Sequence, residues 1–331
     1  MREALFLKKN REKWASYERT PADAPDELAE RFIELTDDLS YARTFYPGSK
    51  TVQYLNGLAS GFHLKIYANR KEKKGRFTAF WREELPLILA RRRRHLWYAF
   101  LLFMIFILIG ALSARLDDEF VRLILGDGYV DMTRENIEKG DPFGVYKETE
   151  PLTMFVSIAF NNIYVACRVF VMGLLGGVGT VFALFQNGVM LGAFEYYFFE
   201  RGLGPESILV VFIHGTLEIS AIIVAGAAGM VLGAGILFPG TYTRRQSTVM
   251  AARDGLKMLV GLMPVFLLAA FFEGYVTRHT GMPLWLSLSI LIASLAFMIG
   301  YFVIYPAKLT TSRNRETTTT SAIPQTQPNR T

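Results

Sequence analysis

The sequence contains very little cysteine and histidine, and this limits the chemistry that it can carry. Its 331 residues include one cysteine, Cys167, and four histidines. A single cysteine excludes an intrachain disulfide and a cysteine-based metal site. Cys167 lies within an apolar run, where we interpret it as a packing residue. The histidines do not form the His-Glu-x-x-His pattern that a zinc peptidase needs.

Charged residues are missing from several long stretches. Residues 96–114 carry no charge, and as a helix they measure about 28 Å, enough to cross the hydrocarbon core of a bilayer. Further apolar runs predict helices at 152–174, 178–198, 207–238, 256–277 and 284–305. The predicted fold class is therefore all-α: a polytopic transmembrane helical bundle of about six spans, with an N-terminal cytoplasmic helical segment.

The distribution of Lys and Arg predicts how these spans are oriented. Residues 1–95 hold 20 Lys and Arg, whereas the loop 115–150 holds ten acidic residues against five basic ones. Lys and Arg concentrate on the cytoplasmic side of a membrane. We therefore expect a protein of the bacterial inner membrane with both termini in the cytoplasm and with the loop 115–150 outside, folded as a small cap. The net charge of +6 then reflects orientation and contact with anionic membrane lipid, and we expect no nucleic acid partner. The charged N-terminal segment also predicts no signal peptide.

Three regions follow from this pattern: a cytoplasmic helical region at 1–95, a transmembrane domain at 96–306 with the external loop 115–150, and a disordered cytoplasmic tail at 307–331. Proline and glycine signals divide the first region into three helices. The third helix has apolar residues every three to four positions, which are Phe77, Phe80, Trp81, Leu85, Ile88 and Leu89. This pattern predicts either an interfacial helix that feeds the first span or a helix packed against its own N-terminal bundle.

Polar residues at membrane depth are the candidate functional residues, because a charge at the bilayer centre costs about 2.5 to 3.5 kcal/mol on insertion scales. We predict one intramembrane polar cluster, made of Asn161, Asn162, Arg168, Asn187, His214 and Glu218. Two further residues, Glu195 and Glu273, lie close enough to predicted span ends to reach an interface, so we leave them out of the cluster.

Helical spacing places members of this cluster on shared faces. His214 and Glu218 are four residues apart, and Asn161 and Arg168 are seven apart. If these faces point inward, Arg168 and the asparagines satisfy Glu218. The cluster is then either a satisfied polar core that fixes helix register or a site of transport or protonation. An intramembrane hydrolase is a third interpretation, although Ser220 lacks the turn context of a serine nucleophile.

Small residues recur at four-residue spacing in the third and fourth spans. This spacing lets helix backbones approach closely, and it predicts helix packing at Gly188, Gly192, Gly226, Gly229 and Gly233. The same stripes fit a homo-oligomer interface.

Ordered motifs connect these residues to a known family. The membrane motifs are Asn161-Asn162, Gly173, Gly177-x-Gly179-Thr180, Asn187-Gly188, Leu191-Gly192, His214-Gly215-x-x-Glu218, Gly226-Ala227-Ala228-Gly229 and Pro239-Gly240. The N-terminal motifs are Asp38-Leu39, Ala42-Arg43, Leu55-Asn56-Gly57, His63 and Ile66-Tyr67. With these motifs the chain resembles the stage II sporulation protein M family over nearly its whole length.

The resemblance implies a membrane scaffold that holds peptidoglycan-degrading partners at the engulfing septum, without catalysis of its own. The long N-terminal region and the tail resemble family members from bacteria that make no spores. Our leading expectation is a non-enzymatic membrane scaffold or assembly component with a protein partner in the cell envelope or cytoplasm. The alternative is a small-solute or proton-coupled transporter that uses Glu218 and His214. We predict no catalytic residue, cofactor or metal site.

Overall fold

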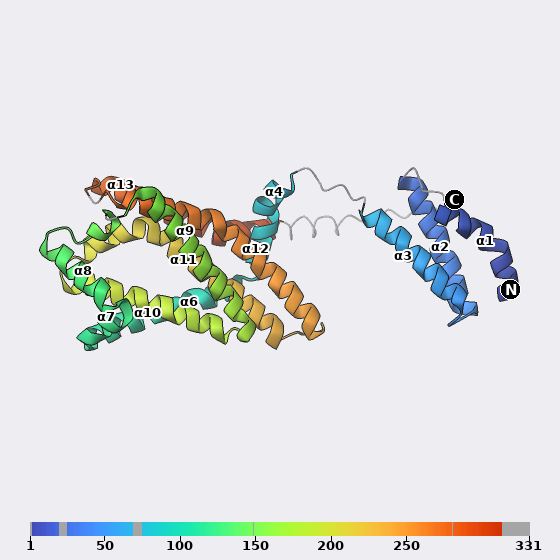
Figure 1. Cartoon of the computed structure of the whole chain (residues 1–331), viewed down its shortest axis with the longest axis horizontal. Coiled ribbons are helices and arrows are strands. Elements are labelled where there is room, and N and C mark those ends of the chain that lie inside the picture. Colours follow the sequence, from blue (N-terminus) through green and yellow to red (C-terminus); the bar gives the residue numbers. More distant parts are fainter. Residues whose placement is uncertain (1, 20–24, 69–74, 148, 280, 313–331) are drawn as a thin grey trace, which may run out of the picture. The chain divides into compact units, whose positions relative to one another are not determined.

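The computed structural model describes residues 2–19, 25–68, 75–147, 149–279 and 281–312. These residues form helices joined by turns, and none of them lies in a strand. The chain divides into two compact units, Met1–Arg76 and Phe77–Thr331, which we call the N-terminal unit and the membrane unit (Figure 1).

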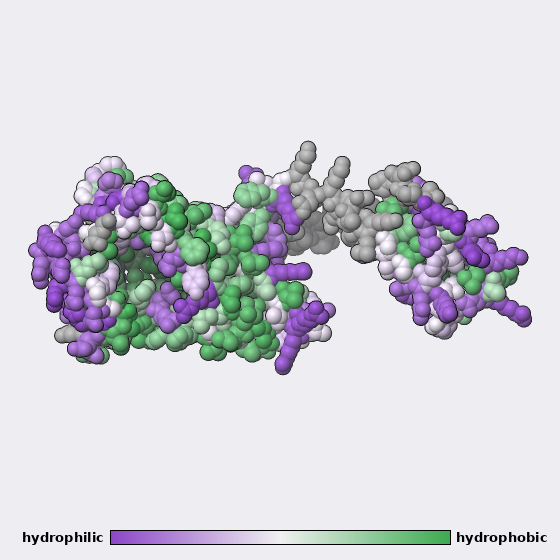
Figure 2. All heavy atoms as spheres, in the orientation of Figure 1, coloured by the Kyte–Doolittle hydropathy of each residue, from purple (hydrophilic) through white to green (hydrophobic). Residues whose placement is uncertain are grey.

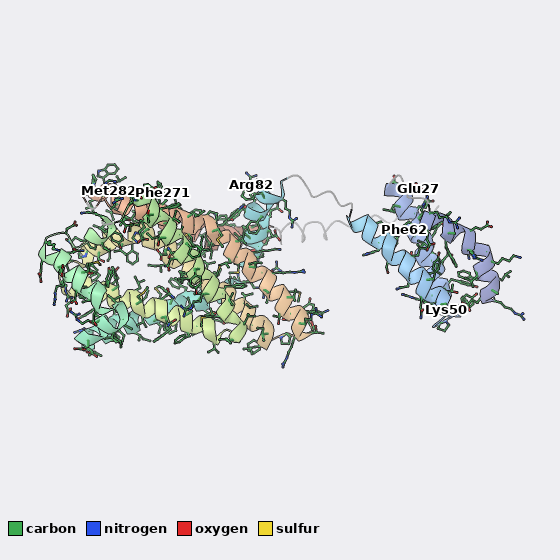
Figure 3. All side chains as sticks on the ribbon, in the orientation of Figure 1. Glu27, Lys50, Phe62, Arg82, Phe271 and Met282 are labelled. Atoms are coloured by element: carbon green, nitrogen blue, oxygen red, sulfur yellow. The ribbon has the colours of Figure 1, made fainter. Side chains whose placement is uncertain are left out.

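The N-terminal unit consists of three helices, α1 (Glu3–Arg19), α2 (Pro25–Phe45) and α3 (Lys50–Ala68). Its buried core is rich in aromatic residues and comprises Phe6, Trp14, Leu35, Leu39, Ala42, Leu55, Ala59 and Phe62. Figure 3 labels Phe62 on this unit. Hydrophilic residues cover much of the visible surface of the unit (Figure 2).

The third helix that the sequence predicts for the N-terminal region is divided into two separate elements in the structure. Beyond α3, a broken helix consists of α4 (Arg76–Ala79), η1 (Phe80–Glu84) and α5 (Leu85–Arg91). Its apolar face lies in the core of the membrane unit, where Leu85 is fully buried and packs against Gly261. The alternative in which this helix packs against the N-terminal bundle is therefore wrong, and its interfacial position stays a prediction.

Among the described residues, six helices of the membrane unit are long and apolar enough to cross a bilayer, which confirms the predicted all-α bundle with about six spans. They are Arg93–Leu116, Pro151–Leu175, Val178–Glu200, Gly204–Leu237, Arg244–Thr277 and Leu284–Ser312. Large apolar side chains face outward on them, as at Phe160, which is 73% exposed. The last helix continues to Ser312, so residues 307–312 of the predicted tail are helical, and residues 313–331 lie outside the described part.

A short glycine turn joins the second span to the third. The first span is α6 (Arg93–Leu116), and the second is α9 (Pro151–Val171) with η3 (Met172–Leu175). Gly176 and Gly177 both have positive φ, at 66° and 85°, and they turn the chain directly into α10 (Val178–Glu200). Glycine adopts this backbone region without steric cost.

The last three spans begin at α11 (Gly204–Leu237), α12 (Arg244–Phe271) and α13 (Leu284–Ile299). A capping box of Thr243 and Gln246 starts α12. Two spans contain π-helical segments: η4 (Phe272–Thr277) continues α12, and η5 (Gly300–Ile304) continues α13.

The loop between the first two spans folds into a cap. It contains α7 (Asp118–Leu125), α8 (Asp127–Glu138) and η2 (Gly144–Lys147), and Figure 1 shows α7 and α8 at one end of the membrane unit. An apolar cluster joins the cap to α10, where Phe143 stacks on Phe198 at 5.3 Å. We call this the cap end and the opposite end the distal end. Met282 lies toward the cap end and Arg82 toward the distal end (Figure 3).

Glycines bring the spans into backbone contact. A Cβ added at Gly192 of α10 would lie 2.0 Å from the carbonyl oxygen of Ile107 on α6, and one added at Gly188 would lie 2.7 Å from Phe106 Cβ. The three predicted packing glycines of α11 make similar contacts. A Cβ added at Gly226 would meet Leu184, one added at Gly229 would meet Thr180, and one added at Gly233 would meet Gly177. All five glycines therefore lie where no larger residue fits without movement.

Candidate functional site

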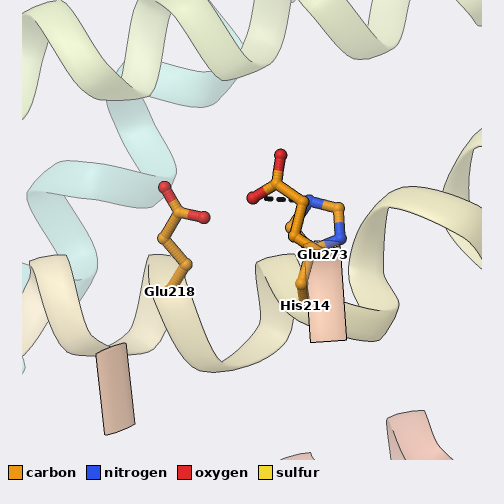
Figure 4. A group of neighbouring side chains, drawn as sticks. All are labelled: His214, Glu218 and Glu273. Carbon is orange, nitrogen blue, oxygen red and sulfur yellow. Dashed lines mark ion pairs between the residues drawn. The ribbon is translucent and has the colours of Figure 1, made fainter. Parts of the chain in front are cut away.

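Three ionisable side chains converge inside the membrane unit. His214 and Glu218 come from α11, and Glu273 comes from η4. His214 Nε2 lies 3.8 Å from Glu273 Oε2, and one ligand atom from each of the three residues lies within 4.8 Å of the others. Figure 4 shows the three side chains gathered in this way. His214 is buried, and both glutamates are half-buried. We call this set the carboxylate–histidine cluster.

The π-helical turn of η4 places two of its residues against the same imidazole. Thr277 Oγ1 lies 3.0 Å from His214 Nδ1, while Glu273 faces Nε2 of that ring. Thr277 is almost fully buried, at 1% exposure. Single π turns inside α-helices occur frequently at functional sites. The turn therefore holds one imidazole nitrogen and leaves the other directed at the carboxylates.

The cluster borders a cavity of about 530 Å³ beneath the cap. Helices α9, α10 and α11, the η4 turn and the cap all contribute to its wall, and Figure 2 shows this end of the unit hollowed. Its polar lining consists of Tyr129, Tyr146, Ser157, Asn161, Asn162, Asn187, His214, Glu218 and Glu273. Within the described part of the chain, the lining includes no Lys or Arg.

Two tyrosines of the cap form the roof of the cavity. The ring of Tyr146 meets His214 edge to face at 5.7 Å. Burial raises the pKa of Tyr129 to about 12. Burial, followed by the nearby charge of Glu273, raises the pKa of Tyr146 well above its ordinary value. Both phenols therefore stay protonated at neutral pH and can donate hydrogen bonds into the cavity.

The predicted asparagines line the same cavity. Asn162 is only 3% exposed, and its amide lies beside the Glu218 carboxylate, but its Nδ2 has no hydrogen-bond partner within bonding distance. Asn161 is exposed and donates weakly to Asn162 Oδ1 at 3.5 Å. Asn187 donates to the Ala183 carbonyl oxygen at 2.8 Å. The structure thus brings together five of the six predicted residues, namely Asn161, Asn162, Asn187, His214 and Glu218.

Arg168 does not join the cluster. Its side chain is exposed, and its guanidinium contacts the amide oxygen of Gln186 at 3.5 Å. Residues seven apart share a helix face, but they lie about 10.5 Å apart along the axis. Arg168 is accordingly about two turns nearer the distal end than Asn161, and the predicted neutralisation of Glu218 by Arg168 is wrong.

Glu273 is a candidate site residue that the sequence prediction left out. It lies four residues before the end of its span, and the prediction placed it at an interface. The cap covers this end of the bundle, so residues near the span end are buried in protein instead. The sequence did carry one indication that Glu273 lies near His214. Both residues lie within about three turns of the cap-side ends of neighbouring antiparallel spans. Glu195 does stay outside the cluster, where it accepts a hydrogen bond from Ser207 at 3.2 Å.

Comparison with known families agrees with the membrane part of the resemblance. A family model described as stage II sporulation protein M matches residues 99–278, more than half of the chain. The chain belongs to the stage II sporulation protein M family. The matched region contains the cap, most of the first span, the next four spans and the whole carboxylate–histidine cluster.

The N-terminal unit matches a different model. Residues 4–68, which contain α2, α3 and all of α1 but its first residue, match a domain of unknown function. The N-terminal motifs quoted above therefore lie outside the region that matches the stage II sporulation protein M family. Searches among curated proteins and among solved structures found no match.

Proposed function

We propose that this chain is a non-enzymatic membrane transporter that binds a small solute or a cation in the cavity beneath the cap. Glu218, His214 and Glu273 are the groups that titrate or bind. One observation carries the proposal: two carboxylates and an imidazole border a polar cavity inside the bundle, and no lining residue of the described chain neutralises them. Such groups are expensive at membrane depth and commonly mark substrate or ion pathways.

The position of Arg168 weighs against the other interpretation of the cluster. A polar core that only fixes helix register needs its charges paired, because an uncompensated buried charge costs about 3 to 5 kcal/mol. Arg168 contacts Gln186 instead of Glu218. The cluster is therefore better explained as a site that receives a cationic or proton-carrying ligand.

The shape of the membrane unit also supports transport. The cavity extends from cap residues such as Ile124 down to Phe103, which lies thirteen residues from the cap-side end of the first span. Toward the distal end, glycine contacts such as Gly173 against Gly229 bring the backbones together. A cavity at one side, above a closed half and beside an irregular helix, fits one state of an alternating-access cycle.

The proposal includes an orientation. The protein lies in a bacterial inner membrane with both termini on the cytoplasmic side and the cap on the outer side. The supporting observations are the 20 Lys and Arg of residues 1–95 and the acidic balance of 115–150. The cavity then lies in the outer half of the membrane unit, beneath the cap.

Proteoliposomes test the transport role. Purified full-length protein is reconstituted with a trapped pH-sensitive dye, and a panel of isotope-labelled inorganic cations, amino acids and sugars is applied while uptake of the label and the dye response are both recorded. We expect at least one solute to produce label uptake or a dye response in wild type that Glu218→Gln abolishes. Glu195→Gln removes a carboxylate outside the cluster and should leave the response unchanged. A panel without any response, or an equal response in Glu218→Gln, would contradict transport.

A second function, a membrane assembly component, is favoured by the separate N-terminal unit. This unit has its own core and its own family match. It also exposes apolar side chains such as Ile33, at 60%, and Phe45, at 57%, which fit a protein partner. A crosslinked pull-down from native membranes should recover that partner with wild type and lose it with Ile33→Asp. Recovery of the same partner by both proteins would count against this role.

A further inference from the structure

We propose that the carboxylate–histidine cluster binds one divalent first-row transition-metal ion, such as Mn²⁺ or Zn²⁺. The protein ligands are His214 Nε2, one oxygen from each of Glu218 and Glu273, and the amide oxygen of Asn162. This inference rests on the proposed function, because it names the class of cation that the same cavity receives.

Three atoms that can bind a metal ion lie close together in the carboxylate–histidine cluster. One imidazole nitrogen and two carboxylate oxygens lie within 4.8 Å of one another. In the described part of the chain, no Lys or Arg lines the cavity around them. A single cation at the centre of this triangle would be within reach of all three ligand atoms after small side-chain movements.

The charge of the cluster and the tautomer of His214 also favour a divalent cation. The hydroxyl of Thr277 can accept a hydrogen bond from His214 Nδ1–H at 3.0 Å. This bond favours the neutral tautomer whose Nε2 lone pair faces the carboxylates. Metal-binding histidines are usually oriented by such a bond on their other nitrogen. A neutral imidazole with two carboxylates carries a charge of about −2, which a divalent cation balances.

Asn162 supplies an observation separate from the three ligand atoms of the triangle. Asn162 is buried at 3% exposure on the wall of the same cavity, and its Nδ2 has no hydrogen-bond partner. A buried amide nitrogen without a partner is costly. A 180° rotation of this amide exchanges its nitrogen and oxygen and directs the oxygen toward the cation beside Glu218. The Asn161 amide, which now donates to Asn162 Oδ1, rotates with it and accepts from the Asn162 nitrogen instead.

The donor set selects the class of metal. Mixed imidazole and carboxylate ligands suit Mn²⁺, Fe²⁺ and Zn²⁺, whereas Ca²⁺ and Mg²⁺ prefer oxygen ligands alone. Copper(I) prefers soft sulfur ligands, and the cavity lining of the described chain contains no cysteine and one methionine, Met190. The expectation from sequence of no metal site weighed ligands on a single helix, whereas the proposed set combines residues of α11 and η4.

Metal binding by the purified protein tests the inference directly. The full chain, purified in detergent with a tag free of histidine, is stripped with EDTA and titrated with MnCl₂. Loss of the free Mn²⁺ electron paramagnetic resonance signal measures binding, and calorimetry with ZnCl₂ repeats the measurement. We expect one high-affinity ion per chain, with Mg²⁺ unable to displace it at equal concentration.

Matched variants identify the ligands. Glu218→Gln and Glu273→Gln should each weaken binding by more than about 100-fold, because each removes a ligand whose loss exceeds the effect of an outer-shell change. Thr277→Val keeps every ligand and removes only the bond to His214, so it should weaken binding by about 10- to 100-fold. Glu195→Gln should bind as wild type does. Circular dichroism and gel filtration check that each variant folds.

Several outcomes would overturn the metal site. One is that wild type binds neither Mn²⁺ nor Zn²⁺ stoichiometrically. Another is that folded Glu218→Gln and Thr277→Val bind the ion as tightly as wild type does. A third is that Glu195→Gln weakens binding as much as these two variants do. The proteoliposome assay separates this result from the proposed function. Metal binding without any solute flux contradicts transport and leaves the site standing, whereas flux without metal binding contradicts only the site.

Discussion

The N-terminal unit and the membrane unit are both helical, but different residues hold their helices together. Large aromatic side chains fill the core of the N-terminal unit, and Gly57 and Gly61 on α3 have open space beside them. In the membrane unit, Gly192 and Gly229 touch the neighbouring helices directly. Burial of large apolar side chains drives packing in water. It has little driving force in lipid, where close contact between small residues replaces it.

The two units also treat polar groups differently. Near the surface of the N-terminal unit, Trp14 Nε1 donates to Asp38 at 2.8 Å, and Lys13 pairs with the same carboxylate at 2.6 Å. Inside the membrane unit, Glu218 and Glu273 lie beside His214 and the Asn162 amide, and no Lys or Arg of the described chain lines their cavity. Carboxylates are thus paired with Lys where water is near and left without a Lys or Arg partner where their cost is highest. This contrast is the reason to assign function to the cavity.

The largest expected effect is an all-or-none difference in labelling between the cap and the N-terminal unit. In a Cys167→Ser background, cysteine at Gly128 of the cap should react with a membrane-impermeant maleimide applied to intact cells. Cysteine at Gly57 of α3 should react only after the cells are permeabilised. Both glycines are exposed and have open space beside them. The opposite labelling pattern would refute the proposed orientation.

Truncation of a core aromatic should strongly affect the N-terminal unit. Trp14 is 1% exposed, and Trp→Ala in a core costs about 3 to 5 kcal/mol. We expect Trp14→Ala to make the amides of α1 to α3 exchange hydrogen rapidly in the full chain, while those of α10 and α11 keep their protection. Phe160→Ala is the control, because this ring is exposed on the outside of a span. A similar loss of protection from Phe160→Ala would break the comparison.

Addition of one methyl group should affect the membrane unit more than the N-terminal unit. A Cβ at Gly192 would lie 2.0 Å from a backbone oxygen of α6. Such overpacking costs about 1 to 3 kcal/mol, so Gly192→Ala should lower the melting temperature of the detergent-purified protein. Gly61→Ala adds the same methyl group in open space and should be neutral or stabilise α3 by up to about 1 kcal/mol. Equal destabilisation by both variants would mean that the two units pack alike.

These contrasts also explain which features the sequence could predict. Most span ends were predictable to within about three residues, because charged residues are costly in hydrocarbon and long apolar runs are a strong signal. The fifth span is the exception at its start: it begins at Arg244, whereas the prediction began at residue 256, because the first turns of this helix carry charged residues such as Arg253. The sixth span also continues beyond the predicted end at residue 305, to Ser312.

The broken helix before the first span was not predictable. Its residues Leu85 and Ile88 show only an apolar face, and an amphipathic pattern does not say which unit covers that face.

The candidate site was predictable in part for a related reason. Helical spacing places residues on a face but not at a depth, so Asn162, His214 and Glu218 were grouped correctly while Arg168 was included wrongly. Glu273 was omitted because its burial depends on the cap, which packs against the bundle through long-range contacts such as Phe143 with Phe198. Such contacts follow from the tertiary fold and leave no local pattern.

The smallest expected effect concerns a charge pair that is exposed instead of buried. In the cap, Arg122 Nη2 lies 2.8 Å from Asp131 Oδ1. The hydrogen bond from Arg122 lowers the pKa of the Asp131 carboxyl. The pair therefore stabilises the folded cap at pH values above about 3.9, the ordinary pKa of Asp, and this contribution is lost as the pH falls through the lower folded-state value.

Because exposed ion pairs contribute little, Asp131→Asn should slightly speed hydrogen exchange in α7 and α8 at pH 7 and leave flux and Mn²⁺ binding unchanged. At a pH below the folded-state pKa, the variant and wild type should exchange alike, because Asp131 is then uncharged in both. Hydrogen exchange with mass spectrometry, corrected for intrinsic rates, measures this. An effect that reached the cavity would mean that the surface pair sets the position of Tyr129 and Tyr146 above the cluster, and the cap would then be part of the binding site.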